Sequence, residues 1–141
     1  MPSILLVEDE PSLRRLIGRW LSRAGFDVTC AENGLVAWQL ITRMQLDTKT
    51  RFDVVLSDIR MPLMSGLELL KKLRAHAPQI PVILMSGSGE IGSKEQAQQS
   101  GAFDFQPKPI GLRGLEQAVR AAVMASNSHA RDSLAVHAVS P

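Results

Sequence analysis

The sequence predicts an α/β domain in which a five-stranded parallel sheet carries helices on both faces. Short apolar segments alternate five times with segments of helical periodicity, and short links join them. That alternation is typical of parallel strands connected by right-handed crossover helices. The run Val54–Leu56 is continuously apolar, as expected for a central strand that is covered on both faces. A chain of 141 residues suits one domain with a sizeable core.

The first helix is predicted from Pro11, because proline is well tolerated in a first turn, and Gly25 marks its end. Its apolar residues follow the spacing of one helix face: Leu13, Leu16, Ile17, Trp20 and Leu21. Its four arginines fall mostly on the other side: Arg14, Arg15, Arg19 and Arg23. We therefore expect the apolar stripe to be buried and the arginines to form a solvated face.

The other elements follow from the same patterns. The expected strands are Ser3–Val7, Asp27–Ala31, the run that ends at Asp58, Pro81–Met85 and Ala102–Gln106. The later helices are expected at Asn33 to about Met44, Gly66–Ala75, about Ile91–Ser100, and from about Leu112 onward. Residues 126–141 are mostly small and polar with no clear period, so we expect a domain at 1–125 and a tail or linker at 126–141.

The composition excludes several classes of protein. A single cysteine, Cys30 in an apolar context, excludes a disulfide framework or a zinc site within one chain and favours a reducing compartment. The N-terminus does not have the pattern of a signal peptide, and no apolar run is long enough to span a bilayer. Tyrosine is absent and no basic run contains aromatic residues. We expect a cytoplasmic soluble protein that binds neither nucleic acid nor membrane directly.

Polar residues close four of the five predicted strands. They are Glu8, Asp9 and Glu10 after the first strand, Asp58 at the end of the third, Ser86 after the fourth and Lys108 after the fifth. The carboxyl ends of parallel strands share one edge of a sheet, where ligands bind. Carboxylates packed together destabilise one another unless a cation joins them, and Mg²⁺ prefers oxygen ligands. The pattern indicates Mg²⁺-assisted phosphoryl chemistry with a carboxylate nucleophile, the alternative being a solvated rim of unrelated charges.

Four motifs extend this interpretation: ILLVEDE, VVLSDIRMPLMSG, VILMSG and FDFQPKP. In this order and at roughly this spacing they resemble the receiver (CheY-like) domain of two-component response regulators, over about Ser3–Ala125. The resemblance implies a flavodoxin-like sheet with the strand order 2-1-3-4-5. It also implies a cis peptide bond between Lys108 and Pro109.

The resemblance implies a role for each candidate residue. Asp58 would accept a phosphoryl group from the phosphohistidine of a histidine kinase. Glu8, Asp9 and Asp58 would hold Mg²⁺, helped by the backbone carbonyl of Arg60. Ser86 would donate a hydrogen bond to the phosphoryl group, and Lys108 would form an ion pair with it. Phe105 would be the aromatic switch residue.

The implied function is signalling rather than turnover of an external substrate. The partners would be a sensor histidine kinase or phosphotransfer protein and a downstream protein, which docks on the face made by the fourth helix, fifth strand and fifth helix. A homodimer is compatible with the resemblance. No DNA-binding or catalytic output domain fits in residues 126–141, so the chain is expected to be a stand-alone receiver or a part of a longer protein.

Several residues depart from the commonest receiver pattern. Ser86 replaces a more usual threonine and Phe105 a frequent tyrosine. Pro107, before the lysine, removes a backbone donor. Arg60 is long and cationic, and the polar loop Gln45–Arg51 is longer than usual. None of these changes removes the predicted site.

Two other functions match parts of the sequence. Residues 87–92 read G-S-G-E-I-G and match the glycine motif of dinucleotide-binding folds, but no acidic residue follows about 20 positions on, and the motif lies in the fourth unit. A small Mg²⁺-dependent aspartyl-phosphate phosphatase is the stronger alternative. The motif of such phosphatases is Asp-x-Asp, whereas in this sequence Arg60 occupies the position of the second Asp.

Overall fold

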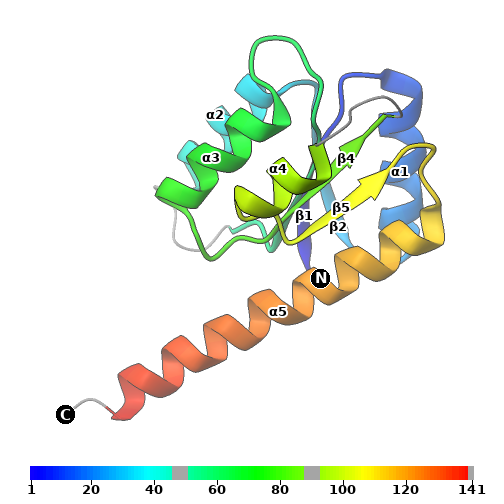
Figure 1. Ribbon diagram of the computed structural model, residues 1–141. Helices are drawn as coiled ribbons and strands as arrows, with labels where there is room; N and C mark the ends of the chain where they lie inside the picture. Colours follow the sequence, from blue (N-terminus) through cyan, green and yellow to red (C-terminus); the bar gives the residue numbers. More distant parts are fainter. Residues whose placement is uncertain (46–50, 88–92, 140–141) are drawn as a thin grey trace.

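The structure, a computed structural model, confirms the five-stranded parallel sheet in the order β2-β1-β3-β4-β5 (Figure 1). It describes the backbone of residues 1–45, 51–87 and 93–139, and the side chains of residues 1–43, 51–87 and 94–127. The strands are β1 (Ser3–Val7), β2 (Asp27–Ala31), β3 (Val54–Asp58), β4 (Val82–Ser86) and β5 (Asp104–Pro107). The helices are α1 (Pro11–Arg23), α2 (Gly34–Gln45), α3 (Gly66–His76), α4 (Ser93–Gln99) and α5 (Leu112–Val139).

Two apolar cores lie on opposite faces of the sheet. Leu5 and Val7 of β1 point to the core that α2, α3 and α4 cover, while Ile4 and Leu6 point to the core under α1 and α5. Figure 1 shows these two helical layers with the sheet between them. Because successive strand residues enter different cores, β1, β3 and β4 have to be apolar at nearly every position.

The strand register brings the carboxyl ends of the strands to one edge. Val7 of β1 lies beside Ser57 of β3, and Asp58 lies beside Met85 of β4. Ser86, the last residue of β4, lies beside Pro107 of β5. The polar residues that follow β1, β3, β4 and β5 are therefore neighbours in space, as the sequence predicted.

The bounds of β4 and β5 differ from those predicted. β4 begins at Val82 instead of Pro81 and includes Ser86. β5 begins at Asp104, two residues later than expected, because Ala102 donates its N–H to the carbonyl of Ala97 at 2.9 Å and so belongs to the end of α4. Gly101 makes this turn possible with a φ of +93°, a left-handed conformation that suits glycine.

The helices also differ in places from the predictions. Leu16, expected in the buried stripe of α1, is 52% exposed, whereas Ile17 and Leu21 are fully buried, so the buried stripe is narrower than the pattern suggested. Helix α4 begins at Ser93, and the predicted start at Ile91 lies outside the described residues. Helix α5 continues to Val139, well into the segment 126–141 that has no helical period, and extends past the body of the domain (Figure 1).

Other expectations concern single positions. The Lys108–Pro109 peptide bond is cis, as the resemblance implied. Cys30 was expected in an apolar context but is exposed on β2. Most of the loop Gln45–Arg51 lies outside the described residues. In the part of the chain that the structure describes, no helix has the length and apolar character needed to cross a membrane.

Candidate functional site

Asp58 is the last residue of β3 and is 5% exposed at the carboxyl edge of the sheet. Its Oδ1 accepts a hydrogen bond from the N–H of Ile59 at 2.9 Å, and its Oδ2 accepts one from Lys108 Nζ at 3.0 Å. Each oxygen of a carboxylate has two lone pairs, so each retains acceptor capacity. The carboxylate is thus held in one orientation without being saturated.

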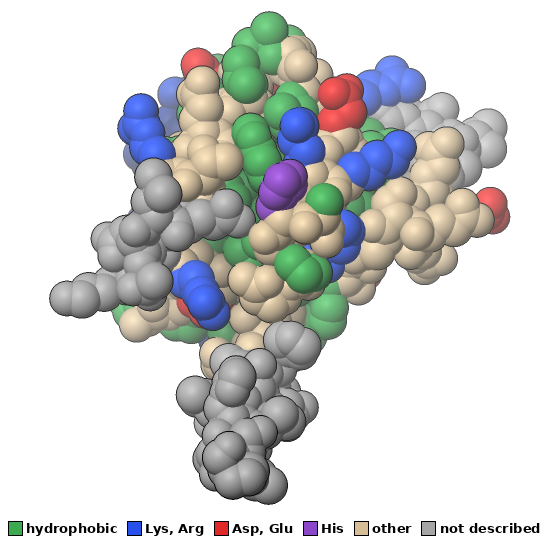
Figure 2. Space-filling view, turned by 90° about the vertical axis from the view of Figure 1, so that its left-hand side faces the viewer, with side chains coloured by type: hydrophobic (Ala, Val, Ile, Leu, Met, Phe, Trp, Pro, Cys, Tyr) green, Lys and Arg blue, Asp and Glu red, His purple; other side chains and the backbone are tan. Residues whose placement is uncertain are grey.

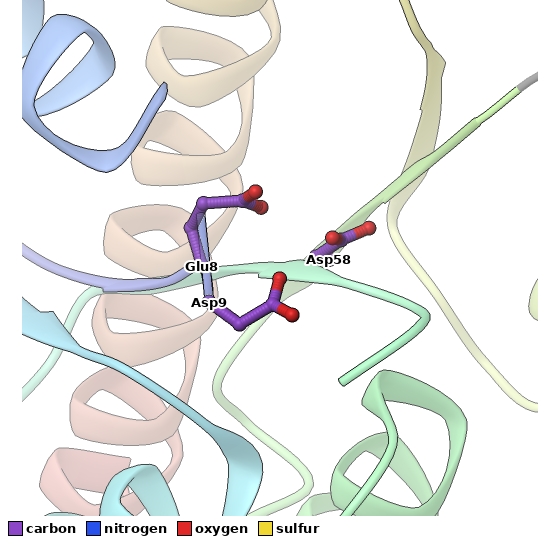
Figure 3. Close-up of side chains that lie close together, drawn as sticks. All are labelled: Glu8, Asp9 and Asp58. Atoms are coloured by element: carbon purple, nitrogen blue, oxygen red, sulfur yellow. The ribbon is translucent and has the colours of Figure 1, made fainter. Parts of the chain in front are cut away.

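Two more carboxylates come to Asp58 from the end of β1. Glu8, Asp9 and Asp58 each offer an oxygen within 4.8 Å of the others, with Glu8 and Asp58 buried and Asp9 exposed. In Figure 3 the carboxyl groups of Glu8 and Asp9 extend toward the side on which Asp58 lies. A set of oxygen donors with one member open to solvent suits a hard divalent cation that keeps part of its water shell.

Glu8 shows most clearly that this cluster is short of positive charge. The residue is fully buried, and its Oε2 has no hydrogen-bond partner among the described residues. Burial, followed by the negative charge of Asp58, raises the pKa of Glu8 from 4.5 to about 7. A buried, orphaned carboxylate oxygen beside two other carboxylates fits the binding of a cation at this cluster.

Lys108 supplies a fixed positive charge from the loop after β5. Its Nζ lies 3.0 Å from Asp58 Oδ2 and 3.4 Å from Glu8 Oε1. Burial lowers the pKa of Lys108, but the hydrogen bond and charge of Asp58 together with the charge of Glu8 outweigh that effect, so the pKa is raised. The backbone N–H of Lys108 also donates to the carbonyl of Ser86 at 2.6 Å, which ties the lysine to the end of β4.

The comparisons with known proteins agree with this geometry. The response regulator receiver domain family matches residues 4–120. The chain belongs to this family. The regulatory protein AtoC of Escherichia coli (strain K12) is 39% identical to the receiver over 120 residues, which cover 85% of this chain and 25% of AtoC.

Other relatives support the same assignment. The DNA-binding transcriptional regulator NtrC of Klebsiella pneumoniae is 41% identical over 107 residues, which cover 76% of the receiver chain and 22% of NtrC. A crystal structure of a response regulator receiver domain protein from Clostridium thermocellum matches with a TM-score of 0.82 at 26% identity, covering 90% of this chain and 98% of that one. The receiver chain spans about a quarter of the length of AtoC and NtrC.

The structure also places the other predicted residues of the receiver. Ser86 ends β4, is 2% exposed and donates its hydroxyl to the carbonyl of Gly87 at 3.3 Å. Phe105 is half-buried on β5 beside Leu84 and packs against the core under α4. Arg60 is exposed on the loop after Asp58. That its backbone carbonyl binds a metal stays a prediction.

Glu10 has a different role from its two acidic neighbours. Its side chain caps α1 by accepting from the backbone N–H groups of Ser12 at 3.0 Å and Leu13 at 2.8 Å. The Leu13 hydrogen bond lowers the pKa of Glu10. The three successive acids after β1 therefore divide into two candidate cation ligands and one helix cap.

Two residues that support the site were missed from the sequence. Arg14, one of the arginines expected on a solvated face, donates from Nη1 to the backbone carbonyl of Glu8 at 2.8 Å. Gly66 packs so closely on β3 that a Cβ there would lie 2.2 Å from the carbonyl oxygen of Asp58. Its position directly after the N-cap Ser65 marked a helix start, but nothing in the sequence indicated this contact.

Proposed function

We propose that this chain is a phosphoacceptor receiver of a two-component signalling system. It takes a phosphoryl group from the phosphohistidine of a sensor histidine kinase or phosphotransfer protein onto Asp58. The observation that supports this proposal is the carboxylate of Asp58, which lies 3.0 Å from the Lys108 ammonium and within 4.8 Å of two more carboxylates. Phosphoryl transfer depends mainly on such positioning and charge neutralisation.

In the proposed transfer, an oxygen of Asp58 forms a bond to phosphorus while the P–N bond of the phosphohistidine breaks. The electron pair of that bond stays on the imidazole nitrogen. The N–H of Ile59 holds the Asp58 carboxylate in orientation, and Lys108 pairs with the charge of the incoming phosphoryl oxygens. Ser86 donates its hydroxyl to one of those oxygens.

Mg²⁺ is the cofactor we propose. Glu8, Asp9 and Asp58 would hold it, with the Arg60 carbonyl as a further ligand. The ion supplies positive charge to the phosphoryl oxygens and to the carboxylates around them. Three oxygen donors, one of them exposed, suit Mg²⁺, which usually keeps several waters.

We further propose that phosphorylation is read on the face formed by α4, β5 and α5. The phosphoryl group draws the Ser86 hydroxyl toward Asp58, and Phe105 turns into the space left behind. Helix α4 is weakly anchored, because Ala97 is the only buried residue among its described side chains. Three glycines before α4 lower the cost of shifting its start: Gly87, which is exposed, and Gly89 and Gly92, which lie outside the described residues. Such a switch needs only a few kcal/mol between its two states.

The remaining parts of the proposal concern context. The receiver assists only its own phosphorylation and dephosphorylation and turns over no external substrate. It acts in the cytoplasm through protein partners or a second copy, without direct contact to nucleic acid.

The test is labelling with acetyl phosphate, followed by intact-protein mass. We expect one phosphoryl group per chain, dependent on Mg²⁺, and no labelling of Asp58→Asn. Asp53→Asn is the matched control, because Asp53 lies before the same strand and accepts from the Ser3 N–H at 2.7 Å, away from the site. Labelling of Asp58→Asn at the wild-type level overturns the proposal. Catalytic turnover of p-nitrophenyl phosphate would instead support the alternative, an aspartyl-phosphate phosphatase.

A further inference from the structure

A groove between α1 and the edge strand β2 is lined by all the basic residues of α1. Its volume is about 430 Å³. Four arginines line it: Arg14, Arg15, Arg19 and Arg23. Gly18 and Cys30 line it as well, and a Cβ at Gly18 would lie 3.7 Å from the Cys30 sulfur. We call this the arginine groove.

The charge of the arginine groove is local; Glu116 lines an adjoining hollow with Arg19 and Arg23 but pairs with Arg120. The chain has 16 basic and 14 acidic residues, so without these four arginines its formal charge would be 12 minus 14, or −2. Arg15, Arg19 and Arg23 have no acidic or carbonyl partner within the described ranges. They are spaced at i and i+4, where like charges destabilise a helix. By contrast, Figure 2 shows basic, acidic and apolar side chains interspersed over the end of the molecule where α3 terminates.

The type of cation indicates the type of ligand. All four basic residues of α1 are arginine, whose planar guanidinium binds phosphate with two parallel hydrogen bonds. A row at i, i+4 and i+8 places the arginines roughly 6 Å apart along the helix. A ligand with several phosphoryl groups could therefore bind more than one of these arginines, which a single phosphate could not.

The lining favours a small ligand over a macromolecule. Among the described residues, no aromatic side chain lines the arginine groove, whereas sites for single-stranded nucleic acid use aromatic residues to stack bases. Of the lining residues that the structure describes, Val28 alone has an aliphatic side chain, and it is half-buried, whereas a docked helix needs several apolar anchors. The volume falls within the range of small-molecule sites.

From these observations we propose that the arginine groove binds a small molecule that carries at least two phosphoryl groups. The ligand lies between the guanidinium groups of α1 and the strand β2, with Cys30 on the groove wall. This site is separate from the Asp58 cluster, although Arg14 contributes to both, because its Nη1 holds the carbonyl of Glu8.

Inorganic tripolyphosphate in metal-free buffer is the probe for this site. We expect saturable binding by titration calorimetry and slower alkylation of Cys30, the only cysteine of the chain, when the probe is present. The double variant Arg19→Gln/Arg23→Gln should weaken binding about tenfold or more, the loss expected when charge-assisted hydrogen bonds to phosphate are removed. Asp58→Asn should bind like wild type, which keeps the result independent of the phosphoacceptor proposal.

The matched control is Arg43→Gln/Arg113→Gln, which removes the same charge from exposed positions on α2 and α5. Binding that does not saturate, or equal losses in both double variants, would show only non-specific attraction and overturn the proposal. Tighter binding of an oligonucleotide or a glutamate-rich peptide, lost in Arg19→Gln/Arg23→Gln, would overturn the small-molecule assignment. Thermal unfolding of each variant verifies that its fold is intact.

Discussion

Gly66 holds Asp58 in place by lacking a side chain. A Cβ there would lie 2.2 Å from the Asp58 carbonyl oxygen and 3.0 Å from the Cα of Ile59, both of which are backbone atoms. The N–H of Gly66 also donates to the carbonyl of Ile59 at 2.8 Å. The loop after β3 is therefore closed directly against the strand that carries Asp58.

Gly66→Ala should lower the free energy of unfolding by about 1–3 kcal/mol, because the added methyl group displaces backbone atoms. The same displacement should reduce Mg²⁺-dependent labelling of Asp58. Chemical denaturation and labelling measure the two effects. Gly87→Ala is the control, since a Cβ there meets nothing within 4 Å, and its effect should stay within about 0.5 kcal/mol. Equal stabilities of the two variants would contradict this account of Gly66.

Glu8 should make the stability of the metal-free protein depend on pH. Burial, then the charge of Asp58, raises the pKa of Glu8 from 4.5 to about 7. Between about pH 4.5 and about pH 7, Glu8 loses its proton in the unfolded chain but keeps it in the folded protein. The stabilising contribution is thus fully present below about pH 4.5 and is lost as the pH rises to about 7.

Glu8→Gln tests this dependence, because the amide keeps the shape of the side chain and cannot ionise. In metal-free buffer the variant should gain about 1–3 kcal/mol over wild type between about pH 5 and about pH 8. Denaturation of both proteins across this range measures the gain. Parallel stability curves for the two proteins would show that Glu8 does not titrate as described.

At the scale of elements, α1 combines a well-packed inner face with features that do not serve stability. Ile17 and Leu21 are fully buried, and Trp20 on the flank donates from Nε1 to Glu116 of α5 at 2.9 Å. Gly18 lies in the middle of the helix, where glycine is about 1 kcal/mol less favourable than alanine. A Cβ at Gly18 would meet only Cys30 Sγ at 3.7 Å and Leu6 Cδ2 at 3.9 Å, which are ordinary contacts.

Gly18→Ala should therefore raise the free energy of unfolding by about 0.5–1 kcal/mol through helix propensity. Thermal and chemical denaturation measure the gain. Gly25→Ala serves as the comparison, because Gly25 has a φ of +100° and alanine should destabilise the protein there. A loss of stability in Gly18→Ala would mean that α1 packs against β2 more closely than the structure shows.

The elements could be predicted from sequence where burial imposes a pattern and less well where it does not. β1 and β2 were predicted to the residue, because an acidic residue follows each strand directly, Glu8 after β1 and Glu32 after β2. The start of β5 was wrong because the hydrogen bond from Ala102 to Ala97 extends the end of α4, a local contact without an apolar signature. The extent of α5 was missed because alanine favours a helix without needing a buried face.

At the scale of the whole molecule, the candidate site could be predicted because topology gathers it. Glu8 lies 100 residues and Asp58 lies 50 residues before Lys108 in the sequence. A parallel sheet nevertheless brings the ends of their strands together. The sequence could not predict that Glu10 caps α1 while Glu8 and Asp9 lie near Asp58, since this difference depends on where α1 begins. Leu16 likewise lines a hollow beside Glu116 of α5, a position that the periodicity of α1 alone does not indicate.

The proposed switch predicts a regional response to phosphorylation. Hydrogen exchange with and without beryllofluoride and Mg²⁺ should change most on the face of α4, β5 and α5, because in the proposed switch Phe105 turns and α4, whose only buried described side chain is Ala97, shifts with it. The strand β1, fully buried from Ile4 to Val7, is the internal control and should not change. Changes confined to the loop after Asp58 would show that the output face lies elsewhere.

The most direct test of the central claim is to locate the phosphoryl group chemically. Borohydride reduces an aspartyl phosphate to homoserine, so treatment of the acetyl phosphate-labelled protein followed by peptide sequencing identifies the acceptor. The account predicts homoserine at position 58, formed only when Mg²⁺ was present during labelling, and none at position 9 or 53. Homoserine at another position, or a phosphoryl group that borohydride does not remove, would contradict it.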